Sequence, residues 1–348
     1  MRGPRWRRAL LAGVVVAAIA TPRAIAQPAP APEPFLLDAP DLRVLAPADL
    51  VARPPRFPFP VGERLEYAVS WFGVPAGTVS IEVARFIEVD GARYAHAVAI
   101  ARTNAVFSAI YEVDDRSEAW IDLDRFATVR TRAVEKHASK HYDESVRYDA
   151  PTQFLLAQLD KVHKRQRREL VFDLGPFAYD TSDLVYLLRA LPLAPGYAVG
   201  VPTYANHKVF EFHVEVTEPR MITTEALGKL PALAVHPSTR LDGRDYAVGD
   251  GVVWVSGAAR VPVRLDGWIR TTSSSFLVSG LRAVLVRYVT SAPGWTPPRD
   301  PLVAPVTQIP RTRDGVPQWD PPPAVRAARE SSGLAPHDTK LSLPTSVR

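Results

Sequence analysis

The sequence contains no cysteine among its 348 residues. This absence excludes disulfides, thiol catalysis, thiolate metal sites and a lipid-modified N-terminal cysteine. The chain also lacks the Gly-x-Ser-x-Gly and His-Glu-x-x-His motifs, a phosphate-binding loop and a dinucleotide fingerprint. We therefore assign no catalytic residue, metal or cofactor from the sequence. Whether the protein is an enzyme stays open, and we favour a non-enzymatic role.

Proline is scarce in the middle of the chain. Of the 34 prolines, 12 lie in residues 1–60, 12 in residues 293–348 and only 10 between them. Because proline has no backbone donor and is excluded from central strands, residues 57–292 are predicted to form the folded β domain. Residues 27–56 are predicted to be a Pro-rich linker, and residues 293–348 a Pro-rich, mostly disordered tail.

The first 26 residues have the pattern of a secretory signal peptide. Several arginines precede an apolar run from Ala9 to Ala20, and Ala24-Ile25-Ala26 forms a small-x-small cleavage site. The run is too short to span a bilayer as a helix, which takes about 20 residues. We expect export to the periplasm with cleavage after Ala26 and no transmembrane segment after cleavage. The sequence leaves the Sec and twin-arginine routes open.

Residues 62–83 predict a β-hairpin. In its first arm an apolar face of period two is formed by Leu65, Tyr67, Val69 and Trp71. Val79, Ile81 and Val83 continue the period in the second arm. The intervening residues 73–77 contain two glycines and a proline, so we expect the chain to reverse there.

Similar strand patterns continue to residue 288, separated by turn signals, and one helix interrupts them. The helix is predicted to begin at Asp180 or Thr181 and to end before Pro192, because Leu184, Leu187, Leu188 and Leu191 share one face. The predicted fold is mainly β: a single large antiparallel curled sheet, either a half-barrel or a barrel, with about a dozen strands. The short helix would cover one opening of this sheet.

Three stretches carry a resemblance to a known family. They are Gly62-Glu63 with Leu65, Tyr67, Ala76 and Gly77; residues 180–189, from Asp180 to Arg189; and Trp254-Val255-Ser256 followed by residues 260–263. Together they resemble the bacterial exported proteins of domain of unknown function 3108. The chain departs from that family at Gly257 and Ala258, where an acidic residue usually follows the Trp-x-Ser. The resemblance implies export and a β fold, but no activity.

Two sets of residues are candidates for binding. Large apolar side chains could line a ligand cavity or simply belong to the core; they are Trp254, Trp268, Leu184 and Leu188. A dense basic segment could bind anions such as lipid headgroups, or could protect a sheet edge from aggregation. Its candidate anion-binding residues are Lys161, Lys164, Arg165, Arg167 and Arg168.

Two weaker patterns involve histidine. His137 and His141, with Asp143 nearby, could form a metal pair or a polar edge. Glu211, His213 and Glu215 could perform acid-base chemistry or face solvent from an ordinary strand.

Three functions follow. The first is a periplasmic protein that binds a lipid or glycolipid in the curled sheet; the second is an envelope scaffold that acts through its Pro-rich arms; the third is a hydrolase of an envelope polymer. The expected partners are a lipid, a glycolipid or another envelope protein, and not nucleic acid. The sequence leaves the oligomeric state open.

Overall fold

A computed structural model describes residues 42–149, 154–173, 179–182, 184–205, 208–241, 244–245, 249–270, 277–290 and 341–342. The predicted signal peptide lies outside these ranges, as does the predicted tail except for residues 341–342. The helical elements are α1 (Pro47–Ala52), α2 (Ala105–Ser108), the 3-10 turn η1 (Val162–Lys164) and α3 (Leu184–Ala190). The strands are β1 (Arg43–Val44), β2 (Arg64–Trp71), β3 (Val74–Val89), β4 (Ala92–Thr103), β5 (Val113–Asp122), β6 (Thr128–His137), β7 (Lys140–Asp149), β8 (Phe154–Lys161), β9 (Gln166–Asp173), β10 (Tyr179–Asp180), β11 (Ala198–Ala205), β12 (Lys208–Thr224), β13 (Gly228–Leu241), β14 (Arg244–Asp245), β15 (Gly249–Ser256), β16 (Pro262–Arg270), β17 (Leu277–Val289) and β18 (Leu341–Ser342).

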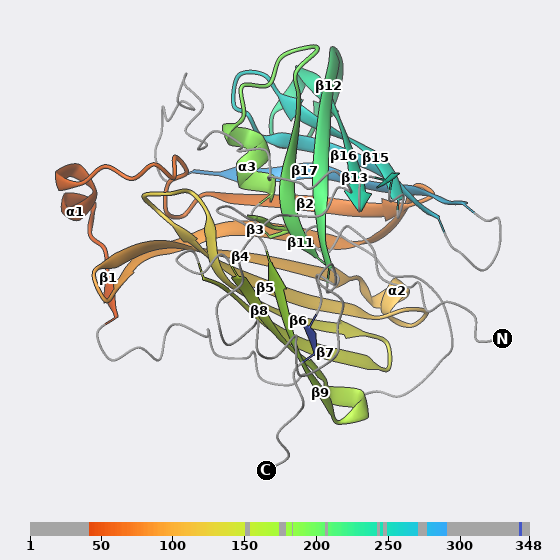
Figure 1. The fold of residues 1–348 in the computed structure, drawn as a ribbon. Helices are drawn as coiled ribbons and strands as arrows, with labels where there is room; N and C mark the ends of the chain where they lie inside the picture. Colours follow the sequence, from red (N-terminus) through yellow and green to blue (C-terminus); the bar gives the residue numbers. More distant parts are fainter. Residues whose placement is uncertain are drawn as a thin grey trace.

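These strands form one 18-stranded sheet built from two meanders. In the first meander, β2 to β9 pair antiparallel in sequence order. In the second, the order is β11, β12, β13, β15, β16 and β17. The pairing of β17 with β2 joins the two meanders (Figure 1). The predicted fold class, a large curled sheet with few helices, is confirmed.

The two ends of the sheet meet through side chains. Within the described residues β9 and β11 do not pair, so the sheet stays open. The Tyr204 hydroxyl of β11 donates a 2.6 Å hydrogen bond to Glu144 of β7, and its ring lies 5.4 Å from that of Phe172 in β9. Packing across the opening therefore takes the place of a strand pairing.

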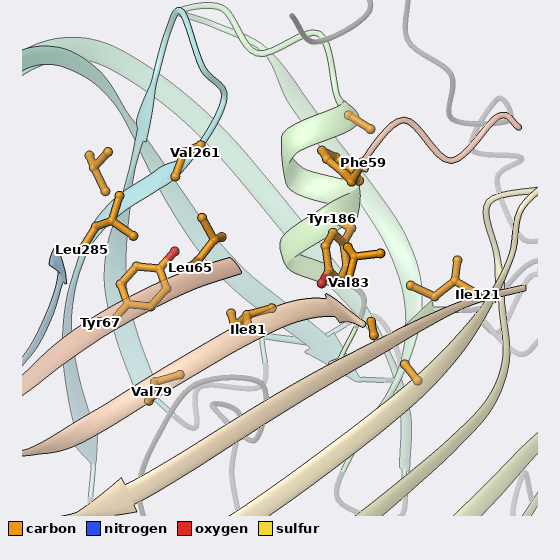
Figure 2. Packing of buried hydrophobic residues seen from close by; sticks show 14 of the residues in the cluster. Phe59, Leu65, Tyr67, Val79, Ile81, Val83, Ile121, Tyr186, Val261 and Leu285 are labelled. Atoms are coloured by element: carbon orange, nitrogen blue, oxygen red, sulfur yellow. The ribbon is translucent and has the colours of Figure 1, made fainter. Parts of the chain in front are cut away.

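The main core fills the concave side of the sheet. In β2 and β3 the alternation predicted from the sequence is confirmed at Leu65, Tyr67 and Val69, and again at Val79, Ile81 and Val83, all of which are buried. Phe57 and Phe59 enter this core ahead of β2 and pack against Tyr186 of α3 (Figure 2). The helix thus plugs the middle of the curved sheet.

The chain reverses between β2 and β3 earlier than predicted. The turn residues are Phe72 and Gly73, with φ of 49° and 79°, and Pro75 and Gly77 belong to β3. Gly77 is required by a close approach, since a Cβ atom there would lie 2.1 Å from the carbonyl oxygen of Arg102 in β4. A bulge between Val69 and Ser70 shifts the register, and Trp71 is half-buried at the sheet edge instead of lying in the core.

Three other elements differ from the sequence prediction. α3 begins at Leu184, later than predicted, because Asp180 belongs to β10. The proline at position 219 does not end a strand as expected, because a register shift between Thr217 and Arg220 accommodates it within β12. The predicted linker 27–56 contains β1 and α1, which Leu45 anchors to the core.

Candidate functional site

A fully buried ion pair joins α3 to the start of β2. The Arg189 guanidinium donates two 2.7 Å hydrogen bonds to the Glu63 carboxylate and one of 2.8 Å to the carbonyl oxygen of Arg260. Tyr288 donates to the same carboxylate at 3.1 Å, and the guanidinium carbon lies 4.2 Å from the centre of the Phe59 ring. Burial disfavours the charged guanidinium, but the hydrogen bonds and charge of Glu63 outweigh burial and raise the pKa of Arg189. The Arg189 guanidinium therefore stays charged, and four hydrogen bonds hold the two side chains in place.

This pair brings together the three stretches that carry the family resemblance. Glu63 comes from the first stretch, Arg189 from the second and Arg260 from the third. The third stretch is also fixed by the Tyr67 hydroxyl, which donates to the carbonyl oxygen of Pro262 at 2.9 Å. Together the three stretches fix the helix against the sheet. The pairing was not predicted from the sequence; an arginine within an apolar helix signals only that it needs a buried partner, not which residue that partner is.

A second buried polar centre surrounds Asp180. One carboxylate oxygen accepts from Tyr148 at 3.0 Å and from Thr131 at 3.3 Å, and the other accepts from the backbone and hydroxyl of Ser182. Burial nevertheless raises the pKa of Asp180, and the nearby Glu144 raises it further. Asp180 therefore links β10, which pairs parallel with β11, to β6 and β7 of the first meander. It does not cap α3 as the sequence suggested.

An apolar pocket lies between α3 and strands β11 and β12. Its empty volume, including open solvent at the mouth, is about 210 Å³. It is lined by Leu184, Leu187, Leu188, Leu191, Val199, Val201, Phe212 and Val214. Two of the predicted ligand-binding residues, Leu184 and Leu188, thus share one wall.

The structure places Trp254 away from these leucines. Trp254 of β15 packs in the main core and donates to Asp266 at 3.0 Å, whereas Leu188 packs in the cluster that includes Val235. Ala234, which pairs with Trp254, faces the main core. Because neighbouring residues of β13 point to opposite faces, the strand separates the two predicted ligand contacts. The side chain of Trp268 lies outside the described residues.

The basic segment forms the hairpin of β8 and β9. Lys164, Arg165 and Arg168 are exposed, Lys161 is half-buried, and the side chain of Arg167 lies outside the described residues. Arg165 occupies the left-handed turn position with φ of 50°. The segment is therefore a protruding cationic tip.

The histidine patterns do not converge on a cleft. A turn separates His137 in β6 from His141 in β7, and His137 contacts Asp115 at 2.7 Å. His213 contacts Glu211 at 3.0 Å while Glu215 is exposed. Within the described residues no group of three or more potential ligands could hold a metal ion. Nor does any described helix have the length and apolarity to cross a membrane.

The fold and these centres define a class of protein: an open, curved sheet with a helix locked into it by a buried ion pair. The sheet is mixed and not purely antiparallel as predicted, because β10 pairs parallel with β11. The chain belongs to the family of proteins of unknown function DUF3108, whose family model matches residues 66–271. The resemblance seen in the sequence is thereby confirmed.

Two solved structures are similar at low sequence identity. One is a beta-barrel-like protein of domain of unknown function DUF1849 from Brucella abortus, with 12% identity and a TM-score of 0.43 over 66% of this chain and 98% of that one. The other is a Bacteroides fragilis protein with a YmcC-like fold, classed as exported, with 12% identity and a TM-score of 0.30 over 67% and 98%. Among curated proteins, none matches this chain.

Proposed function

We propose that the protein is a non-enzymatic periplasmic protein that binds the apolar chain of a lipid or glycolipid beneath α3. The observation that carries this proposal is the pocket between α3 and strands β11 and β12, whose eight lining residues are all apolar. A hydrocarbon chain has no polar atom that needs a hydrogen-bond partner. The side chains that line the pocket have none either, so neither side loses a hydrogen bond on binding. The signal-like first 26 residues support export.

The construction of α3 supports the same proposal. One side of the helix is fixed by Arg189 through Glu63, and the leucines that line the pocket lie on another. Because the 210 Å³ of the pocket includes open solvent at its mouth, the enclosed space is far smaller than the roughly 300–1,000 Å³ of typical small-molecule sites. Ligand entry therefore requires the leucine side chains to move apart while the ion pair keeps the helix in place.

A matched pair of substitutions on β11 tests the proposal. Val199 lines the pocket, and the preceding residue, Ala198, is exposed. Val199→Phe should fill the pocket and abolish binding of hexadecanoic acid measured by titration calorimetry. Ala198→Phe adds the same ring on the other side of the strand and should leave binding unchanged.

Two results would contradict the proposal. One is wild-type protein that binds no hexadecanoic acid and carries no acyl chain in native mass spectrometry after purification from the periplasm. The other is equal affinity in Val199→Phe and wild type, which would place the acyl chain elsewhere.

A further inference from the structure

One edge of the β2–β9 meander is formed by the tips of alternate hairpins. In an antiparallel meander every second turn lies at the same edge. The register confirms this, because one row of paired residues crosses the strands just inside the tips: Thr78, Arg102, Asp114, Lys136 and His141. We name the tips β2–β3, β4–β5, β6–β7 and β8–β9 the hairpin edge. Figure 1 shows them following one another past α2 to the end of β9.

The hairpin edge exposes large apolar side chains. The described residues leave nine such side chains exposed, and five of them lie on this edge: Phe72, Val74, Val106, Ile110 and Val162. Val106 is 70% exposed and Phe72 is 61% exposed. Trp71 joins the first two tips, since its ring lies 5.3 Å from Phe72 and 6.0 Å from Phe107 of α2. Phe72, Val74, Val106 and Ile110 therefore form the apolar part of this edge on two successive tips, and Val162 lies apart from them on the β8–β9 tip.

Phe72 is held in place at a conformational cost. Its φ of 49° belongs to the left-handed region, where a residue with a Cβ atom costs about 1–2 kcal/mol. Asn would suit this turn position before Gly73 far better. Gly280 makes room for the ring, because a Cβ atom there would lie 2.8 Å from it. A phenylalanine that is strained and exposed does not stabilise the fold, so its presence here indicates a functional role.

The charges of the edge are segregated. The segments 70–78 and 103–111 contain no Asp, Glu, Lys or Arg, although such residues make up 23% of the chain. At the far end of the same edge, Lys164 and Arg165 are exposed beside Val162. The edge thus combines an uncharged apolar part with a cationic part, about six strand spacings or roughly 29 Å apart.

We infer that the hairpin edge is a docking surface for an anionic lipid bilayer. The tips of β2–β3 and β4–β5 insert Phe72, Val106 and Ile110 among the acyl chains, and the β8–β9 tip contacts lipid phosphates through Lys164 and Arg165. Insertion of residues 70–78 and 103–111 desolvates no charged side chain of these segments, while the exposed Glu112 that follows them stays at the aqueous boundary. Cations near the surface add electrostatic attraction. A protein partner would instead favour a patch with a charged, hydrogen-bonding rim. This surface is independent of the pocket beneath α3.

Vesicle flotation of the full-length protein tests the inference. The probes are vesicles of phosphatidylcholine alone and vesicles with phosphatidylcholine and phosphatidylglycerol in equal parts. Phe72→Asn, which suits the turn and should fold, is expected to lower the partition coefficient on both by about ten-fold or more. Lys164→Glu with Arg165→Glu should weaken binding only to the anionic vesicles, and added salt should do the same.

Val51→Asn is the matched control, because Val51 is 82% exposed on α1 at the opposite edge. It should bind both vesicles as the wild type does. The inference is overturned if the wild type floats with neither vesicle, or if Phe72→Asn floats as well as the wild type. It is also overturned if sedimentation shows that the wild type is a dimer and the Phe72→Asn variant a monomer. The apolar side chains would then join two copies of the chain.

Discussion

The buried centre of the molecule and its hairpin edge use their most unusual side chains in opposite ways. At the centre, Glu63 and Arg189 are charged side chains yet buried, and the hydrogen bonds that Arg189 donates to Glu63 and to the Arg260 carbonyl hold α3 in the sheet. At the edge, Phe72 and Val106 are apolar yet exposed, and neither belongs to the main core formed by the described residues. The residues that carry the family resemblance therefore stabilise the fold. The exposed residues of the hairpin edge do not, and they are the better candidates for contact with other molecules.

The centre should be the more sensitive region. Replacing Arg189 by Met leaves the Glu63 carboxylate buried without its partner, which should cost about 3–5 kcal/mol of unfolding free energy. Urea unfolding measures this loss. The double variant Glu63→Met with Arg189→Met should recover much of the stability, since it removes both charges. A single variant as stable as the wild type would show that α3 is held by its apolar contacts alone.

The Asp180 centre should show its effect through pH. Because the folded-state pKa of Asp180 is raised above its ordinary value of 3.8, its contribution to stability is present below that value and is lost as the pH rises through the folded pKa. Asp180→Asn should remove this decline and cost about 1–3 kcal/mol through altered hydrogen bonds. Thermal unfolding between acidic and neutral pH measures both effects.

Glu118 provides the opposite case. Burial raises the pKa of Glu118, but hydrogen bonds from His96 and Arg116 outweigh burial and lower it below 4.5. Its contribution is therefore present above that value and is lost as the pH falls. If Glu118→Gln and Asp180→Asn changed the pH profile in the same direction, the assignment of these two environments would be wrong.

At the edge, substitution should leave the fold intact. Phe72→Asn relieves the left-handed strain and should stabilise the protein by about 1 kcal/mol. Chemical denaturation measures the gain while vesicle binding is lost. A destabilised Phe72→Asn variant would assign Phe72 to folding and weaken the contrast between the two regions.

The smallest effect is expected at the cationic tip. Lys164→Glu with Arg165→Glu changes two exposed side chains and should alter the unfolding free energy by no more than about 0.5 kcal/mol. The same denaturation experiment checks this value. A larger loss would show that the β8–β9 hairpin needs these residues for its own stability.

The parts of this fold that could be predicted from sequence are those set by local periodicity. The alternation in β2 and β3 and the leucines of α3 follow from the spacing of neighbours along the chain. The pairing of Glu63 with Arg189 joins residues 126 apart in sequence, so no local pattern predicts it. The hairpin edge was also hidden, because the register of β2 to β5 is needed to place the tips that carry Phe72 and Val106 on one edge.

The absence of cysteine makes one measurement especially direct. Val106→Cys on α2 and Val51→Cys on α1 each create a single labelling site at opposite edges of the sheet. With an environment-sensitive fluorophore at each site, anionic vesicles should shift the emission of the Val106 variant to the blue and leave the Val51 variant unchanged. Equal shifts at both sites, or a shift at Val51 alone, would contradict the assignment of the hairpin edge as the face that meets the membrane.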